Sequence, residues 1–367
     1  MTFLLLLFAL VCLFSMSKTE VGAGFAYLSR HHTCFINGFF IIYVFLRHIS
    51  EYSIRMSSLD AMFFELEGHI MGQLLVSTFL FFSGYGIQLS LQNKGRAYVK
   101  DLVRKRFLGL LRNFALAVLI YVAVQYALGN IFSVQRVALS LVAWSSVGNS
   151  NWFIFMTLVE YLIIAVCYAA FSRYGRGAPV LATACVTLFW TFTICFFKEY
   201  YWFNTIMCVP MGMFLALFRD AACRWQVRMG WRVLFIVLPL VVVGRELHVQ
   251  SYWWCEGLIH PYIASCLGTT LSNTGAVLFA GGIALLAGWL SVAGFMPTRM
   301  GKLLVWCGGP ALFYLYIFQR LPMLVGDHFG MAASHGYAYF ILCLVVTVAL
   351  AWLAMWGNDK LFGNGKR

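Results

Sequence analysis

The sequence predicts an all-α polytopic membrane protein with about eleven transmembrane helices. Of its 367 residues, 62% are hydrophobic and only 11% are charged, and the mean hydropathy is +0.82. Soluble proteins usually contain about 25% charged residues, so this composition favours a lipid environment. The apolar residues fall into eleven stretches, and basic residues are concentrated in every second connection between them.

Each predicted helix is an apolar stretch bounded by polar or charged residues. The stretches lie at 3–16, 33–49, 70–90, 108–128, 151–171, 178–197, 201–218, 231–244, 272–293, 303–319 and 337–356. About 20 apolar residues cross a bilayer as a helix, so most of these stretches are close to the required length. The first resembles a signal-peptide core, but no basic residue precedes it and no cleavage site follows closely. We therefore expect a retained helix that extends into Met16–Phe25.

Basic residues predict the orientation of the chain in the cell membrane. The connections rich in Lys and Arg contain Lys18 and Arg30; Lys94, Arg96, Lys100, Arg104, Lys105 and Arg106; Arg173 and Arg176; Arg219, Arg224, Arg228 and Arg232; Arg299 and Lys302; and Lys360, Lys366 and Arg367. The alternate connections contain one basic residue each, namely Arg55, Arg136, Lys198, Arg245 and Arg320. Because basic loops stay in the cytoplasm, we expect a multi-pass protein with its amino terminus outside and its carboxyl terminus inside.

The chain is predicted to form a single membrane domain, 1–367. Residues 1–28 form an extra amino-terminal helix and connection, and 29–356 form the core. The net charge of +13 lies in short loops beside apolar segments, which favours contact with anionic lipid over nucleic-acid binding. The cysteines form no CxxC pair and no His/Cys cluster, so no metal site is expected. Cys255 and Cys266 lie in one predicted outer loop. They are either free thiols or, in an oxidising compartment, a disulfide.

The predicted inner connection 91–107 has more cations than a topology signal needs. Arg104, Lys105 and Arg106 lead into an apolar stretch that itself contains Arg112. Guanidinium groups bind phosphate through paired hydrogen bonds, so these four residues are candidates for binding a phosphorylated cytosolic donor. The alternative for Arg112 is that its side chain extends to the lipid headgroups.

The predicted outer connection 245–271 combines aromatic rings with hydrogen-bonding groups. Its candidate substrate-binding residues are Trp253, Trp254, Glu256 and His260. Aromatic residues at a membrane boundary commonly form an interfacial belt. The same residue types also stack on sugar rings, which makes this loop a candidate contact for a carbohydrate.

Three candidate catalytic residues lie within apolar stretches, where polar side chains are costly. His48, near the outer end of 33–49, is suited to accept a proton from a hydroxyl. The adjacent Arg47 is a candidate for stabilising an oxyanion or for pairing with an outer-loop carboxylate; the pairing is favoured because neighbouring helix positions point about 100° apart. Glu160 lies in the middle of a stretch and needs a partner, for which Arg112 or a polar acceptor pathway is a candidate.

Several of these features, taken in order, resemble the acyltransferase-3 family of membrane acyltransferases. They are an apolar helix ending in His48, an acidic outer connection, the motif FFSGYGI at 81–87, a basic connection with Arg104–Phe107 opening the next helix, Asn151-Trp152-Phe153 opening a helix with Glu160, and FYLYIFQRLP at 313–322. The resemblance covers about residues 25–356 and implies a core of ten helices, with 3–16 as an additional one.

The resemblance implies transfer of an acyl group, usually acetyl from acetyl-CoA, to a hydroxyl of a carbohydrate or glycolipid of the cell envelope. His48 matches the family's signature histidine and would be the general base. The family usually has a basic residue eleven positions earlier, where this chain has Asn37, and often a histidine where this chain has Gln319. Candidates for the missing cation are Arg30, Arg106 and Arg112.

The alternative function is a transporter or flippase for envelope saccharides, which also needs many helices and buried polar residues. Transporters commonly show two related halves with paired broken helices near the bilayer midplane. The sequence shows neither feature. A third alternative, a purely structural or regulatory membrane protein, does not explain Arg47, Arg112, Glu160 and the basic connection 91–107. We therefore favour the acyltransferase hypothesis.

Overall fold

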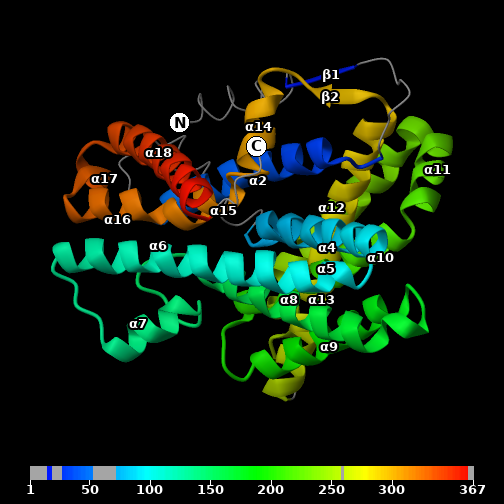
Figure 1. The fold of residues 1–367 in the computed structure, drawn as a ribbon, viewed down its shortest axis with the longest axis horizontal. Coiled ribbons are helices and arrows are strands. Elements are labelled where there is room, and N and C mark those ends of the chain that lie inside the picture. Colours follow the sequence, from blue (N-terminus) through cyan, green and yellow to red (C-terminus); the bar gives the residue numbers. More distant parts are fainter. Residues whose placement is uncertain (1–14, 19–26, 53–71, 258–259, 363–367) are drawn as a thin grey trace.

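The computed structural model describes residues 15–18, 27–52, 72–257 and 260–362. Most of this part is helical (Figure 1). The main helices are α2 (Arg30–Ile49), α4 (Leu74–Lys94), α5 (Ala97–Asp101), α6 (Leu108–Ala127), α7 (Val134–Leu141), α8 (Trp152–Phe171), α9 (Ala178–Ile194), α10 (Cys208–Leu217), α11 (Arg219–Met229), α12 (Leu234–Cys255), α13 (Pro261–Val292), α14 (Gly301–Cys307), α15 (Leu312–Phe318), α16 (Arg320–His328), α17 (Met331–Ser334) and α18 (Gly336–Phe362). A π-helical turn, Leu102–Phe107, joins α5 to α6.

Seven helical units in the described residues are long and apolar enough to cross a membrane: α2, α4, α5 to α6, α8, α11 to α12, α13 and α18. The bent pair formed by α14 with α15 and α16 would make an eighth. α9 and α10 are apolar but shorter. The prediction of an all-α, multi-pass membrane protein is thus confirmed at this level, whereas the count of eleven helices is not. The predicted first helix, 3–16, falls almost entirely outside the described residues.

The predicted helix at 303–319 is broken in the structure. α14 and the helical segment Leu312–His328 meet at an angle of 68°. The break contains Gly308, Gly309 and Pro310, and proline lacks the N–H that would continue a helix. A Cβ atom at Gly308 would overlap backbone atoms of α2, and one at Gly38 of α2 would overlap the carbonyl of Leu304. Two glycines therefore let α2 pack directly against this bend.

Glycines also hold α4 against α10. A Cβ atom at Gly84 would overlap the carbonyl oxygen of Val209, and one at Gly212 would overlap that of Phe81. Small residues allow this close backbone approach between membrane helices. The FFSGYGI motif thus has a packing role in positioning α4.

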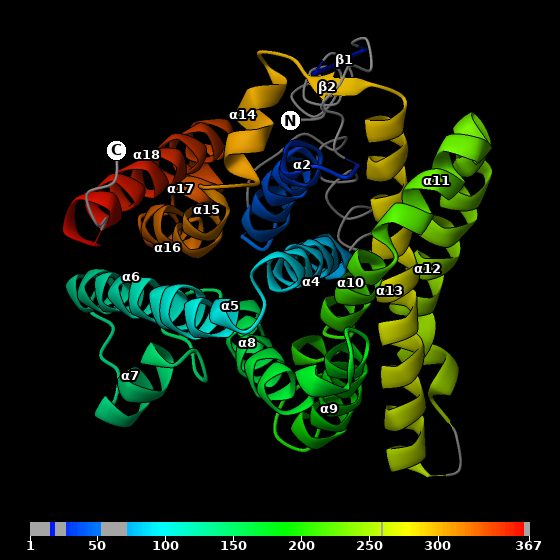
Figure 2. The same cartoon turned by 45° about the vertical axis from the view of Figure 1, so that its right-hand side comes forward.

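Two predictions about local structure were wrong. The predicted outer loop 245–271 is mostly helical, because α12 continues to Cys255 and α13 begins at Pro261; the two form a long antiparallel hairpin (Figure 2). Cys255 and Cys266 are free thiols. Met16–Lys18, predicted to extend the first helix, forms strand β1, which pairs antiparallel with β2 (Phe295–Pro297). The loop prediction failed because the run of apolar residues ends at 244, whereas the helix continues to Cys255.

Candidate functional site

A cavity of about 750 Å³ opens among helix ends that the charge pattern places on the outer side. Six segments line it: the end of α2, the start of α4, the connection 146–152 before α8, the connection 200–204, the last turns of α12, and α15 with α16. Each of these segments adjoins a connection that is poor in basic residues. We call this the outer cavity.

His48 and Arg47, both predicted from the sequence, line the outer cavity. The ring of His48 lies 6.3 Å from the ring of Tyr316, and its Nδ1 is buried without a hydrogen-bond partner. Gln319 lies beside it and also has a buried, unpartnered oxygen, Oε1. The late-helix residue singled out in the sequence is therefore next to His48 in space.

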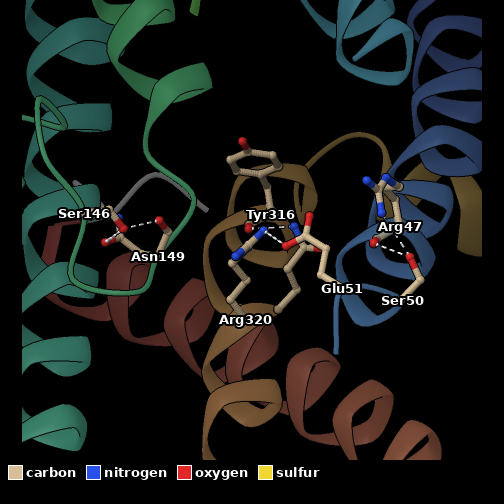
Figure 3. A network of polar contacts seen from close by, with 8 residues as sticks. Arg47, Ser50, Glu51, Ser146, Asn149, Tyr316 and Arg320 are labelled. Atoms are coloured by element: carbon tan, nitrogen blue, oxygen red, sulfur yellow. Dashed lines mark hydrogen bonds and ion pairs between the residues drawn. The ribbon is translucent and has the colours of Figure 1, made fainter. Parts of the chain in front are cut away.

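One ion pair crosses the cavity wall. Arg320 of α16 pairs with Glu51, the residue that follows Ser50 at the end of α2. Figure 3 shows the carboxylate of Glu51 directed at Arg320. Glu51 is thus the partner of Arg320 and not of Arg47, whose hydrogen bond within the described chain goes to Ser50 Oγ at 3.2 Å. The other acidic residues of that connection, Asp60, Glu65 and Glu67, lie outside the described residues.

The connection before α8 adds a rigid polar edge. The side-chain amide of Asn151 donates to the carbonyl oxygens of Ala143 and Ser145 at 2.9 and 3.0 Å, which closes the loop on itself. Asn149 Oδ1 accepts from the backbone N–H of Val147 at 3.1 Å, and Ser146 Oγ donates to the carbonyl oxygen of Asn149 (Figure 3). These bonds fix the side chain of Asn149 and leave its Nδ2 buried without a partner.

Aromatic rings and a second histidine form another part of the cavity wall. Tyr200, Tyr201 and Tyr252 line the cavity with Trp152, and the rings of Tyr200 and Tyr252 lie 4.9 Å apart. His248 Nδ1 lies 3.0 Å from both the carbonyl oxygen and the hydroxyl of Ser272 on α13. A lining of rings, amides and hydroxyls is suited to a sugar.

A lysine fixes the connection 200–204 to the polar edge. Lys198 Nζ donates to the carbonyl oxygen of Trp144 at 2.8 Å and lies 4.0 and 4.3 Å from the ring centroids of Trp144 and Trp202. Burial lowers the pKa of this amine. The contact ties two segments of the cavity wall together.

Other sequence candidates do not line the outer cavity. Glu160 is buried on α8, where its Oε1 accepts from Thr187 Oγ1 of α9 at 2.9 Å and its Oε2 has no partner. The predicted partner Arg112 makes other contacts: it donates to Asn358 at 2.7 Å and stacks 3.6 Å from the ring centroid of Phe362. The proposed pairing of Glu160 with Arg112 was therefore wrong.

The candidate sugar contacts predicted from the sequence lie near the tip of the α12–α13 hairpin. Trp253 and Trp254 are 68% and 48% exposed, and His260 caps α13 by accepting from the backbone N–H of Tyr262. None of the four, Trp253, Trp254, Glu256 and His260, is among the residues that line the outer cavity. The residues of α12 that line it are His248, Val249 and Tyr252, which directly precede Trp253 in the helix.

A smaller cavity of about 300 Å³ lies at the opposite end of α4. Arg96 and Arg176 line it, and Arg96 Nε donates to Ser172 Oγ at 2.9 Å. The donor candidates Arg104, Lys105, Arg106 and Arg112 are not in its lining, and Lys105 pairs with Asp101 at 3.0 Å. We call this the inner cavity.

Comparisons with known proteins add no further information on the chain. No protein-family model, curated protein or solved structure matches it. The assignment of function therefore depends on the residues of the two cavities.

Sequence reasoning missed several of the lining residues. Asn149, Asn204 and His248 lie in connections or helix ends with no recognisable motif. A signal did exist for Trp152 and Tyr316, since both stand in segments already singled out, Asn151-Trp152-Phe153 and FYLYIFQRLP. The individual roles of these two rings depended on the tertiary contacts.

Proposed function

We propose that this protein is a membrane-embedded O-acyltransferase that transfers an acyl group, most simply acetyl from acetyl-CoA, to a hydroxyl of an envelope or exported carbohydrate or glycolipid. The supporting observation is a convergence in space. His48, Asn151-Trp152 and Tyr316, from three motifs that are far apart in the sequence, all line the outer cavity. A shared cavity is what an enzyme built from these motifs requires.

In the proposed reaction His48 is the general base. It removes the proton of the acceptor hydroxyl as the oxygen bonds to the acyl carbon. The carbon–sulfur bond of the thioester then breaks, and the departing thiolate takes the proton from His48, so the products are the O-acyl ester and the free thiol. General-base catalysis of this kind contributes about 10²–10⁴-fold in rate. Glu160 has no part in this scheme, because it does not line the cavity.

The donor would approach from the inner cavity. Val76 at the outer cavity and Leu91 at the inner cavity both belong to α4. They are 15 residues apart, or about 22 Å along a helix at 1.5 Å per residue. The phosphates would remain with arginines on the inner side while the thioester extends toward His48.

The test of the reaction uses purified protein, labelled acetyl-CoA and an envelope-glycan extract as acceptor. We expect His48→Ala and His48→Gln to lose about 10²–10⁴-fold in transfer at matched protein concentration. His335→Gln, which removes an exposed imidazole at the start of α18, is the control and should match the parent. Near-normal transfer by His48→Gln would refute the role of base.

Donor binding is tested separately by titration with CoA. The Arg96→Gln/Arg176→Gln variant is compared with an Arg104→Gln/Lys105→Gln/Arg106→Gln variant. The arrangement predicts that the first weakens CoA binding and that binding by the parent falls with added salt, because exposed charges are screened. Weakening only in the second would locate the donor at the π-helical turn instead.

A transporter is the second candidate, because the span formed by α14, α15 and α16 is broken between Cys307 and Leu312. Transporters use broken helices, but in corresponding pairs. In the described residues this is the one bent pair that meets the length and composition of a span. Reconstituted vesicles distinguish the two functions: a transporter accumulates unmodified saccharide without acetyl-CoA, whereas the proposed enzyme does not.

A further inference from the structure

Among the described residues, the lining of the outer cavity contains two arginines but only one carboxylate. Among its described lining residues, the charged side chains are Arg47, Glu51 and Arg320. Glu51 is paired with Arg320. Nearby Tyr52 adds no negative charge, because burial raises the pKa of its hydroxyl to about 12. Arg47 therefore lines the cavity without a carboxylate partner in the described part of the chain.

The same cavity has buried hydrogen-bond donors without acceptors. Asn149 Nδ2 and Arg320 Nε are both buried and unpartnered, and neither atom can accept a hydrogen bond. The hydroxyls of Ser150 and Tyr316 also have no hydrogen-bond partner, and a hydroxyl can donate or accept a hydrogen bond. Asn204 Oδ1 can only accept a hydrogen bond, and His48 Nδ1 donates or accepts according to its tautomer. A ligand that supplies oxygen acceptors would satisfy most of this wall.

We infer that the acceptor of this site is an acidic saccharide, whose carboxylate or phosphate group is bound by Arg47. Guanidinium binds both anions through paired, charge-assisted hydrogen bonds, and the aromatic wall packs against the sugar. This inference rests on the proposed function, and it specifies the class of acceptor. It also assigns Arg47 to substrate selection.

The competing role for Arg47 is stabilisation of the oxyanion formed during transfer. That role would be independent of the acceptor's charge, so its loss would slow transfer to acidic and neutral acceptors equally. Selection of an anionic acceptor predicts a different pattern. Loss of Arg47 would weaken binding of acidic sugars and leave neutral sugars nearly unchanged.

The experiment measures sugar binding by tryptophan fluorescence, since Trp152 lines the cavity. The probes are three matched sets: glucose, glucuronate and glucose 6-phosphate, and the corresponding galactose and mannose compounds. Parent, Arg47→Gln, Arg47→Lys and the control Arg245→Gln are titrated in detergent. Arg245 is a cation of α12 on the same predicted outer side that does not line the cavity.

For the parent, we expect at least one acidic sugar to bind about 10–100-fold more tightly than its neutral counterpart. Arg47→Gln should remove most of that preference, Arg47→Lys should retain part of it, and Arg245→Gln should retain all of it. Uronates and sugar phosphates are scored separately, so the result also identifies the anion.

Equal binding of acidic and neutral sugars by the parent, or an unchanged preference in Arg47→Gln, would overturn the inference. So would the absence of binding by every acidic sugar. Because the titration needs no acyl donor, these outcomes are separate from failure of the proposed function, which would be the absence of transfer from acetyl-CoA to any acceptor.

Discussion

The contact between α4 and α10 gives a quantitative prediction, because two neighbouring glycines of α4 have opposite surroundings. A Cβ atom at Gly84 would lie closer than 3.0 Å to the carbonyl oxygen of Val209, a separation that real Cβ atoms essentially never show. A Cβ atom at Gly86 would have no atom outside its own helix turn within 4 Å. Gly84→Ala therefore needs a shift of two backbones, whereas Gly86→Ala needs none.

The difference between the two variants isolates the cost of that shift. Both gain the same helix propensity, about 1 kcal/mol for Gly to Ala. Overpacking costs about 1–3 kcal/mol, and the upper end applies here because the opposing atom is backbone and cannot change rotamer. Gly84→Ala should thus be less stable than Gly86→Ala by about 3 kcal/mol.

The assay is the fraction of protein that stays monodisperse in detergent after heating through a series of temperatures. We expect Gly86→Ala to match or exceed the parent and Gly84→Ala to lose monodispersity several degrees lower. Because α4 also contributes to the outer cavity, Gly84→Ala should weaken sugar binding as well. Equal stability of the two variants would refute the close approach of α4 and α10.

Three further predictions concern burial, packing and topology. Thr187→Val should destabilise the protein by about 1–3 kcal/mol, because it leaves buried Glu160 without its hydrogen bond. Glu160→Gln should preserve acyl transfer, because Glu160 does not line the outer cavity. A transfer defect in a stable Glu160→Gln protein would contradict the placement of Glu160 outside the site. Lys198→Met should lower the free energy of unfolding by about 1–3 kcal/mol, because it removes a hydrogen bond and two cation–π contacts. The same heating assay measures this loss, and an unchanged profile would argue against the contact of Lys198 with Trp144 and Trp202. Single cysteines at Lys100 and Trp254, in a background without native cysteines, should react with impermeant reagents from opposite sides of the membrane, and labelling from one side would exclude the predicted orientation.

Much of the helical framework was predictable from the sequence. The predicted stretches 33–49, 108–128 and 151–171 correspond closely to α2, α6 and α8. They could be predicted because the run of apolar residues needed to cross a bilayer is a local property of the chain. The break in 303–319 also had a local signal in Gly308-Gly309-Pro310, but its angle depends on packing against α2.

The candidate site was predictable only in part, because its residues are brought together by contacts between distant segments. His48 and Arg47 could be singled out locally, since a polar group in an apolar stretch is costly and needs a reason. The partner of Glu51 could not be predicted from the sequence, because Arg320 lies 269 residues later. Trp253 and His260 do not line the outer cavity, because the position of a residue in the chain does not show which cavity its side chain faces. The sequence by itself determined the all-α, multi-pass membrane class and the positions of several apolar helices, whereas tertiary packing alone decided which helix ends meet around the outer cavity.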